Sequence, residues 1–417
     1  MQSTVHIAGG GISGLAAGVR LAGAGYLVRL HEAAQQMGGR CRSYFDGATN
    51  LTIDNGNHLV LSGNQSVLAY AREIGSEAGL QGPPEAEFQF IDLAADKRWT
   101  LRINDGRVPL WVFDSARRVP DTSPADYFAL APLIWASAGT RVGDAIKCEG
   151  VLYKRLVLPL LLAALNIDPP DGSAGLAGAI VRETLLAGGQ ACRPLIARDG
   201  LSSVLIEPAI DYIRARGGSV DVGHEVRHLT MANGRVTELA LGDQAIALGP
   251  HDAVVMAVPP RSAATLLPGL TVPTRFRAIV NAHFRFVPPP HHPPMIGVVN
   301  GLIEWLFAFP DRFSITISGG DRLVDMPREE LARAIWKDIC AVAGLKAEMP
   351  AWQIVRERRA TFEASPEQNA LRPGTLTAWK NLFLAGDWTD TGLPATIEGS
   401  VRSGNRAADH VLKTRSI

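Results

Sequence analysis

The N-terminal segment Val5-His6-Ile7-Ala8-Gly9-Gly10-Gly11-Ile12-Ser13-Gly14 constrains the fold of this chain more than any other feature. Its first residues predict a buried strand, and its glycines follow at the GxGxxG spacing ahead of an apolar helix. Gly9 permits a tight turn, Gly11 lets the backbone approach a pyrophosphate, and Gly14 lets the helix pack closely. Because the helix N-terminus would face the phosphate charge, the segment predicts the first βαβ unit of a dinucleotide-binding fold.

An acidic residue and a second glycine-rich segment follow this unit. Glu32 ends the second predicted strand, where its carboxylate can accept both hydroxyls of an adenosine ribose and disfavours a 2′-phosphate. Gly38-Gly39-Arg40-Cys41-Arg42-Ser43 comes next. Two glycines and two arginines in this place indicate a second clamp on a diphosphate, which domains that bind only NAD do not need.

The other end of the chain carries the complementary half of such a site. A strand predicted over Leu382–Ala385 delivers Gly386 and Asp387, whose carboxylate can accept a hydrogen bond from a ribityl hydroxyl of a flavin. Ala395-Thr396-Ile397-Glu398-Gly399 then opens the last helix. Its free N–H groups and positive dipole end can hold the negative charge of a reduced flavin at N1 and O2. The two ends of the chain together indicate FAD rather than NAD.

Composition limits the function classes that this chain can belong to. Its 417 residues exceed the size of most single cores, so two domains are expected. Lys+Arg and Asp+Glu balance at 41 each, so no overall charge favours nucleic acid. The four cysteines form neither a CxxC pair nor a metal-ligand spacing, so no metal site is predicted, and reduced thiols in a cytoplasmic protein are the simplest interpretation.

The pattern of strands, helices and turns predicts an α/β fold with two interleaved domains. A discontinuous Rossmann-like FAD-binding domain of the GR2 type is expected to comprise residues 1–67, 196–262 and 375–417. An α+β substrate domain of the amine oxidase type is expected to be inserted into it, with residues 68–195 and 263–374.

More local patterns predict elements within these passages. Asn233-Gly234 marks a hairpin turn between two strands. Apolar helices with Pro and Trp are expected to dominate 68–195, where the sequence shows few β alternations. Farther along, strands are expected near 278–287 and 313–318, followed by a helix over 328–342.

The segment Asp54-Asn55-Gly56-Asn57-His58 combines a glycine with two titratable side chains. Gly56 suggests a backbone that lies flat against a planar group. His58 and Asp54 are candidates for proton transfer. The alternatives are a satisfied core histidine and a carboxylate that braces its own loop.

Two uncharged runs, Tyr127–Thr140 and Leu156–Leu165, are shorter than the roughly 18 residues needed to span a bilayer. They predict core helices. The alternative is a surface that dips into lipid, or the wall of an apolar channel.

The combination of these motifs resembles the flavin-containing amine oxidase and phytoene desaturase superfamily from end to end. The residues that carry this resemblance are GGGISG, Glu32, GGRCRS, Asp54 with Gly56, Ala253–Pro259, AGDW and PATIEGSVRSG. Further stretches resemble one branch, the bacterial squalene-associated flavoenzymes or hydroxysqualene dehydroxylases. They are residues 54–58, 164–169, 304–307, 359–362 and 388–394.

The resemblance implies non-covalently bound FAD. The family's FAD-binding residues correspond in this chain to Gly9, Gly11, Ser13, Gly14, Glu32, Gly39, Arg40, Gly56, Asn57, Val226, Gly386, Asp387, Ala395 and Thr396. Among them, Val226 would pair its backbone with the adenine.

For the branch, the resemblance implies reductive dehydroxylation of hydroxysqualene to squalene in hopanoid biosynthesis. Water would leave an allylic carbon after protonation, and reduced FAD would deliver hydride from N5 to the resulting cation. The proton donor is expected among His58, Asp54 and Asp390. Trp305 and Phe307 would line the cavity and stabilise the cation, unless they are ordinary strand core.

The implied substrate, a long-chain isoprenoid, is too insoluble to arrive by free diffusion. We therefore expect a cytoplasmic protein that is peripheral on the inner face of the cell membrane. Other enzymes of the squalene pathway are possible partners, and the electron donor is unknown.

Three alternatives follow from the same residues. An isoprenoid desaturase would carry nearly the same motifs and move hydride from substrate to oxidised FAD. A soluble amine oxidase is disfavoured, because no paired-aromatic cage can be placed in the sequence. A non-catalytic flavoprotein or lipid carrier is disfavoured by the complete set of cofactor motifs.

Overall fold

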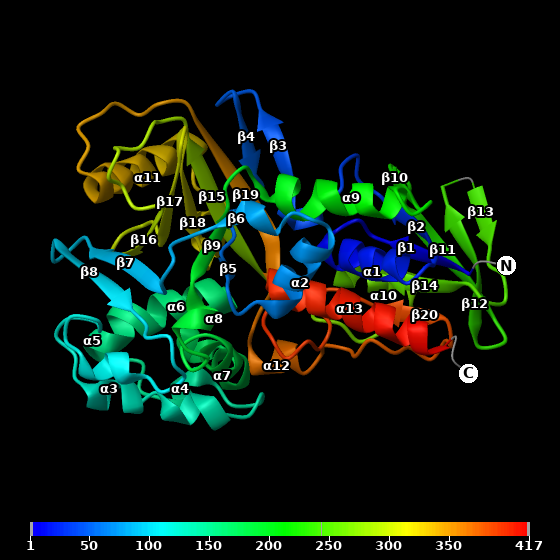
Figure 1. Cartoon of the computed structure of the whole chain (residues 1–417), viewed down its shortest axis with the longest axis horizontal. Helices are drawn as coiled ribbons and strands as arrows, with labels where there is room; N and C mark the ends of the chain where they lie inside the picture. The colour runs from blue at the N-terminus through cyan, green and yellow to red at the C-terminus, as the bar shows by residue number, and fades with distance from the viewer. Residues whose placement is uncertain (1–2, 243, 415–417) are drawn as a thin grey trace.

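Two sheets at opposite ends of the molecule organise the structure. The computed structural model describes residues 3–242 and 244–414. Figure 1 shows a parallel sheet at the end that also holds both termini, and a larger mixed sheet at the other end with helices beneath it. Within the described ranges, no helix has the length and apolar character needed to cross a membrane.

The parallel sheet joins strands that are far apart in the sequence. Its order is β10 (Ser219–Val222), β2 (Leu27–Glu32), β1 (Thr4–Ala8), β14 (Ala253–Met256) and β20 (Leu382–Leu384). Since β14 pairs with both β1 and β20, the first and last strands of the chain belong to one sheet. β1, β14 and β20 are almost entirely buried, as expected of parallel strands covered on both faces. The predicted α/β fold class is confirmed.

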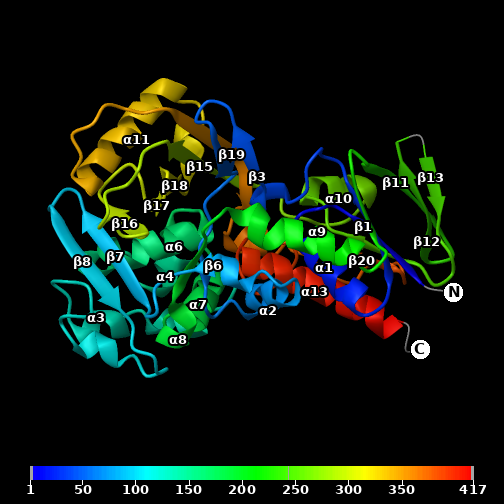
Figure 2. The same ribbon diagram turned by 45° about the horizontal axis from the view of Figure 1, so that its top comes forward.

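Helices α1 (Ile12–Gly23), α9 (Glu207–Arg214) and α13 (Ile397–Thr414) run along this sheet (Figure 2). α1 contacts both of the others. A Cβ at Gly404 of α13 would collide with the carbonyl oxygen of Ser13, so the two helices approach as closely as a glycine allows. The first and last helices of the chain are therefore packed together, like its first and last strands.

A small antiparallel sheet adjoins the parallel one. It consists of β11 (Val226–Ala232), β12 (Arg235–Leu241) and β13 (Gln244–Ala247). Asn233 and Gly234 connect β11 to β12 with φ angles of 53° and 72°. An Asn-Gly pair adopts such positive φ angles readily, and the predicted hairpin is confirmed.

The mixed sheet forms the opposite end of the molecule. Its order is β19 (Trp352–Phe362), β15 (Phe276–Phe284), β18 (Arg312–Ile317), β17 (Trp305–Phe309), β16 (Met295–Val299), β7 (Glu87–Asp92) and β8 (Lys97–Arg102). Helix α11 (Arg328–Ala343) covers one face and buries Ile335 and Ile339 against the strands. The strands predicted near 278–287 and 313–318 and the helix predicted over 328–342 are confirmed.

Helices dominate the passage 68–195, as predicted, but two of its strands belong to the mixed sheet. This passage contains β6 (Leu80–Gln81), β7, β8 and β9 (Pro194–Ala197), and β7 pairs in parallel with β16. The apolar alternation of β7 is short, since it rests on Phe88 and Phe90 before the strand ends at Asp92. Its place in the sheet depends on a partner strand some two hundred residues later in the chain, which local patterns do not reveal.

The remaining elements connect the two sheets. The helices are α2 (Gln65–Glu73), α3 (Pro124–Phe128), α4 (Val142–Ala145), α5 (Gly150–Leu152), α6 (Leu158–Leu165), α7 (Ala174–Glu183), α8 (Gly189–Cys192), α10 (Pro260–Leu266) and α12 (Pro366–Asn369). The short strands are β3 (Ser43–Asp46), β4 (Leu51–Asp54) and β5 (Val60–Leu61). All strands of the parallel sheet fall in segments assigned to the FAD-binding domain, and all strands of the mixed sheet fall in the other segments. The domain boundaries themselves stay a prediction.

Candidate functional site

A cavity of about 1230 Å³ extends between the two sheets. Its lining includes the turns that follow β1 and β20, side chains of β15, β17 and β18, and one face of α6. Ligands of open parallel sheets bind beyond the carboxyl ends of the strands, which is where the first part of this cavity lies. The cavity therefore has a half beside the parallel sheet and a half beside the mixed sheet.

The turn between β1 and α1 accepts only glycine at two positions. Gly9 has a φ of +106°, and a Cβ there would lie 2.5 Å from the carbonyl oxygen of Ala257. A Cβ at Gly14 would collide with the carbonyl oxygen of Gly9. Gly11, by contrast, lines the cavity and has no atom within 4 Å of the place its Cβ would take. This leaves open space in front of the helix N-terminus, where free N–H groups and the positive dipole end favour a phosphate.

Glu32 lies at the end of β2, beside this turn. Its Oε2 accepts a hydrogen bond from the N–H of Gly10 at 2.6 Å, and its Oε1 accepts one from the N–H of Ala34 at 2.8 Å. These bonds hold the carboxylate at the cavity wall. The position is the one predicted for an acid that binds the ribose.

Arg40 and Asp387 link the two ends of the chain at the cavity. Nη2 of Arg40 lies 2.8 Å from Oδ1 of Asp387, whose side chain is almost completely buried. Arg40 also donates a hydrogen bond to the carbonyl oxygen of Ala360. The negative charge of Asp387 raises the pKa of Arg40, so the guanidinium stays charged. The pair presents a cation for phosphate and a carboxylate for a polyol to the same space.

The start of α13 also lies at the cavity. Ala395 and Thr396 are part of the wall, and the Thr396 hydroxyl accepts a hydrogen bond from the N–H of Gly399 at 3.0 Å, which caps the helix. Glu398 accepts hydrogen bonds from the N–H groups of Ser66 and Val67, at 3.1 and 3.0 Å, at the start of α2. The closing motif thus stabilises two helix N-termini at once.

Asn57 provides an acceptor that the protein does not use. Its amide group donates to the carbonyl oxygen of Ile315 at 3.1 Å and to the Thr316 hydroxyl at 3.3 Å. Its Oδ1 is buried and has no hydrogen-bond partner among the described residues. Next to it, Gly56 lies so close to Asn281 that a Cβ would come within 3.1 Å of the amide nitrogen. A position without a side chain next to a free acceptor is suited to a planar heterocycle.

Most of the residues predicted to bind FAD line this one cavity: Gly9, Gly11, Ser13, Glu32, Gly39, Arg40, Gly56, Asn57, Gly386, Asp387, Ala395 and Thr396. Gly14 packs behind the turn, as its packing role requires, whereas Val226 begins β11 and is not part of the lining. The open anion position at α1, the free acceptor on Asn57 and the Arg40–Asp387 pair fit the parts of FAD. The roles of the individual residues stay predictions.

Only one of the three predicted proton donors lies on the cavity wall. His58 lines the cavity, and burial together with the charge of Arg40 lowers its pKa to about 4, so the ring is neutral near neutral pH. Asp54 is buried behind the wall, where its Oδ1 accepts hydrogen bonds from the Ser43 hydroxyl at 2.5 Å and the Leu201 N–H at 2.9 Å. This placement fits the alternative role of a loop brace.

Asp390 is also absent from the lining. Its side chain is exposed, and its Oδ1 accepts a hydrogen bond from the N–H of Gly392 at 3.3 Å. The placement of Asp54 and Asp390 therefore does not support the predicted catalytic role for either residue.

The wall beside the mixed sheet is mostly apolar. Trp305 and Phe307 line it as predicted, and the edge of Trp305 meets Phe90 with the ring centroids 5.6 Å apart. Leu156, just before α6, and Leu160, on α6, also line this wall. Trp305 and Phe307 also pack within the strand core, so both interpretations given to them apply.

A short polar strip interrupts this apolar wall. Thr316 lies near the end of β18 and Ser318 directly follows the strand, and both line the cavity. The Thr316 hydroxyl donates a hydrogen bond to Oδ1 of Asn281 at 2.8 Å, next to Gly56 and Asn57. The strip begins beside the predicted flavin-binding backbone and extends into the apolar half.

Glu304 lies directly behind Ser318. Its Oε2 accepts a hydrogen bond from the Ser318 N–H at 2.8 Å, and the Ser318 side chain lies beside this carboxyl group. Burial raises the pKa of Glu304 to about 7, an effect that the Ser318 hydrogen bonds and the charge of Arg322 oppose. Glu304 is therefore a carboxyl group that exchanges its proton near neutral pH, one hydroxyl away from the cavity.

Asn166 completes this network from the end of α6. Its amide nitrogen donates to the Thr361 hydroxyl at 2.9 Å, and its Oδ1 accepts a hydrogen bond from the Gly319 N–H at 2.7 Å. Asn166, Glu304 and Thr361 come from three of the stretches that resemble one branch of the superfamily. Sequence reasoning gave none of them a role. Their shared branch resemblance was the only signal, and their convergence depends on the tertiary structure.

Comparison with known proteins agrees with this geometry. The family model described as flavin containing amine oxidoreductase matches residues 12–412. The hydroxysqualene dehydroxylase of Rhodopseudomonas palustris is 66% identical over 413 residues, which cover 99% of both chains. The hydroxysqualene dehydroxylase of Sinorhizobium fredii is 65% identical over 412 residues, again 99% of both chains. Among solved structures, cyclohexylamine oxidase from Brevibacterium oxydans superimposes with a TM-score of 0.73 at 16% identity and covers 100% of both chains.

Proposed function

The chain belongs to the flavin-containing amine oxidoreductases and, among them, to the hydroxysqualene dehydroxylases, and on this premise we propose that it reduces hydroxysqualene to squalene with FAD as cofactor. The observation that carries the proposal is the two-part cavity. One half matches the parts of FAD, and the other half is an apolar wall with a single polar strip. A long isoprenoid that carries one hydroxyl group needs this combination, because its chain requires apolar contact and its hydroxyl requires hydrogen bonds.

The reaction breaks one C–O bond and forms one C–H bond. Bound as the reduced flavin, FAD supplies the hydride for the new C–H bond and is oxidised. The hydroxyl group leaves as water, so the protein must provide one proton at the substrate oxygen. The apolar wall would exclude other water from the allylic carbon, and the Trp305 ring on this wall would stabilise positive charge.

We propose Glu304 as the source of this proton. Ser318 lies on the cavity wall beside the Glu304 carboxyl group, so its hydroxyl would pass a proton to the substrate oxygen and take one from Glu304. His58 is a weaker candidate, because an imidazole with a pKa of about 4 is almost entirely in its neutral form near neutral pH and so is a poor acid. Asn166 would hold the Ser318–Gly319 backbone in position through its bond to Gly319.

An anaerobic turnover assay tests the function. Purified protein with photoreduced FAD is incubated with hydroxysqualene, and the products are extracted and identified by mass spectrometry. We expect squalene, with one flavin oxidised per molecule formed. No squalene under these conditions would exclude the dehydroxylase function. Flavin reduction by an isoprenoid hydrocarbon, with formation of a new double bond, would support the desaturase alternative.

We further propose that the protein takes its substrate from the inner face of the cell membrane. The passage from Leu110 to Trp135, which includes α3, exposes large apolar side chains. Leu110 is 61% exposed, Phe113 59%, Phe128 61% and Trp135 78%. The rings of Phe113 and Phe128 lie 6.3 Å apart, so part of this surface is contiguous. Exposed apolar patches of this kind are typical of membrane or protein contact. At the membrane the protein would also meet other enzymes of the squalene pathway.

A further inference from the structure

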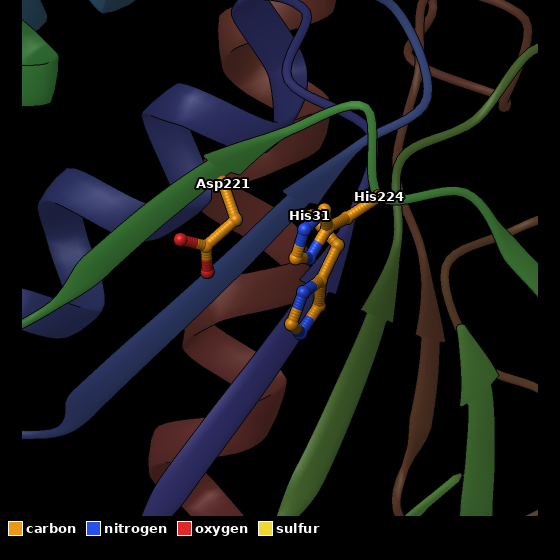
Figure 3. A group of neighbouring side chains, drawn as sticks. All are labelled: His31, Asp221 and His224. Carbon is orange, nitrogen blue, oxygen red and sulfur yellow. The ribbon is translucent and has the colours of Figure 1, made fainter. Parts of the chain in front are cut away.

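Three side chains with metal-binding groups meet at the ends of β2 and β10, outside the cavity lining. They are His31 on β2, Asp221 on β10, and His224 just after β10. Figure 3 shows the three side chains gathered beside these strands, and their ligand atoms all lie within 4.8 Å of one another. Because His31 is far from the other two in the sequence, no ligand spacing could reveal the cluster, and the sequence predicted no metal site.

His31 has one ring nitrogen engaged and one free. The ring is 4% exposed, its Nε2 lies 3.3 Å from Nδ1 of His6, and the planes of the two rings are nearly parallel, with an angle of 8° between them. Its Nδ1 is buried and has no hydrogen-bond partner among the described residues. A proton on Nε2 that is donated to His6 leaves the Nδ1 lone pair free. Metal-bound histidines are commonly oriented in this way by a partner on the second nitrogen.

The other two side chains are held close to this nitrogen by their backbone and neighbours. The Ser219 hydroxyl donates a hydrogen bond to Oδ2 of Asp221 at 2.9 Å, which leaves Oδ1 available. The backbone N–H of His224 donates to the carbonyl oxygen of Glu32 at 2.8 Å, so the start of this loop is tied to the end of β2. The His224 side chain is exposed, and one of its ring nitrogens already lies within 4.8 Å of the ligand atoms of His31 and Asp221.

We propose that His31, Asp221 and His224 bind one divalent transition-metal ion of the zinc class. Two imidazoles and one carboxylate form a ligand set that suits Zn²⁺, with a fourth position for water. Metal–ligand bonds of about 2.0–2.2 Å bring tetrahedral ligand atoms to roughly 3.5 Å from one another. Asp221 and His224 would therefore close around His31 by about an ångström.

The ion would have a structural role beside the adenosine part of the FAD site. It would join β2 to the end of β10. Its ligand His31 directly precedes Glu32, whose carboxylate holds the glycine-rich turn through Gly10. β10 is the outermost strand of the parallel sheet, so a metal crosslink would stabilise an edge that otherwise pairs on one side only. The reaction itself would not require the ion.

Metal titration of the tag-free holoenzyme tests the proposal. After chelator treatment and dialysis, Zn²⁺ is titrated by calorimetry into the wild type, His224→Ala, Asp221→Asn and His228→Ala. His228 is the matched control, because it is also an exposed histidine and lies four residues beyond His224. We expect one site per chain with micromolar or tighter affinity in the wild type and in His228→Ala. We expect at least a tenfold weaker affinity in His224→Ala and Asp221→Asn.

Thermal unfolding gives a second readout that does not depend on heat signals. Zn²⁺ should raise the unfolding temperature of the wild type and of His228→Ala, and should raise that of His224→Ala much less. The proposal would be overturned by a wild type that binds no Zn²⁺ at micromolar concentrations. Equal affinity in the wild type and in His224→Ala would overturn it as well.

Discussion

The two halves of the cavity are built on different principles. In the half beside the parallel sheet, a ligand would be held by backbone turns and by a charge pair, such as the Gly9–Gly14 turn and Arg40 with Asp387. In the half beside the mixed sheet, an apolar wall surrounds a polar strip that ends at Ser318 and Glu304. The first half depends on short sequence motifs, whereas the second depends on residues that the tertiary structure brings together.

This difference predicts that FAD binding and turnover can be separated by substitution. A change in the glycine-rich turn should remove the cofactor and, with it, all activity. A change in the polar strip should leave the cofactor in place and affect only the reaction. The following experiments test this separation, beginning with the largest effect.

The substitution Gly14→Ala should abolish FAD binding. Its Cβ would collide with the carbonyl oxygen of Gly9, so α1 and the turn would have to move apart and the phosphate position would be lost. We expect the affinity for FAD to fall more than about a hundredfold, equivalent to roughly 3 kcal/mol. The purified variant should then contain almost no flavin, as measured by absorbance. Gly47→Ala is the control, because no atom lies within 4 Å of its Cβ position. Full flavin content in Gly14→Ala would contradict the assignment of this turn.

The substitution Glu304→Gln should lower squalene formation by roughly 10²-fold or more while FAD stays bound, because it removes the proposed general acid and keeps the side-chain shape. The measurement is single-turnover oxidation of the reduced flavin by hydroxysqualene. Glu348→Gln, which changes an exposed carboxylate, should behave like the wild type. A Glu304→Gln enzyme with unchanged rate would rule out Glu304 but leave the dehydroxylase function intact.

The pH dependence of the rate distinguishes Glu304 from His58. The donor must be protonated, and the pKa of Glu304 is raised to about 7, so the rate should be maximal below pH 7 and fall about tenfold per unit above it. Donation by His58, whose pKa is lowered to about 4, would instead give a rate that rises down to pH 4. The decline above pH 7 should disappear in Glu304→Gln. If the rate of Glu304→Gln still declines above pH 7, the decline belongs to another titratable group.

Sequence patterns indicated the cofactor half because its motifs are short and most of their residues are consecutive in the chain. Strand, glycine turn and helix are consecutive at Gly9–Gly14, and Glu32 follows one strand later, so their relative positions are fixed locally. The packing of β14 between β1 and β20 then joins the two ends of the chain. The placement of Asp54 and Asp390 away from the cavity wall could not be read from the sequence, because residue type and nearness to a motif do not determine which way a side chain points.

The substrate half could be identified only as a resemblance. Asn166, Glu304 and Thr361 gain their roles from contacts across the fold, and the pKa of Glu304 depends on burial that no local pattern reports. The two uncharged runs show the same limit. Leu156–Leu165 supplies cavity wall and core, whereas Tyr127–Thr140 exposes Phe128 and Trp135, although both runs look alike in the sequence.

The smallest expected effect concerns this second run. The double substitution Phe128→Ser and Trp135→Ser should weaken binding to liposomes of phosphatidylethanolamine and phosphatidylglycerol by several-fold to about tenfold, because it removes two apolar side chains from the proposed contact surface. Co-sedimentation measures the bound fraction, and the flavin content should not change. Leu376→Ser is the control, since Leu376 is 63% exposed outside this helical passage. If the double variant and Leu376→Ser bind liposomes equally well, the membrane contact lies elsewhere. The runs Tyr127–Thr140 and Leu156–Leu165 would then differ only in how each packs against the rest of the protein.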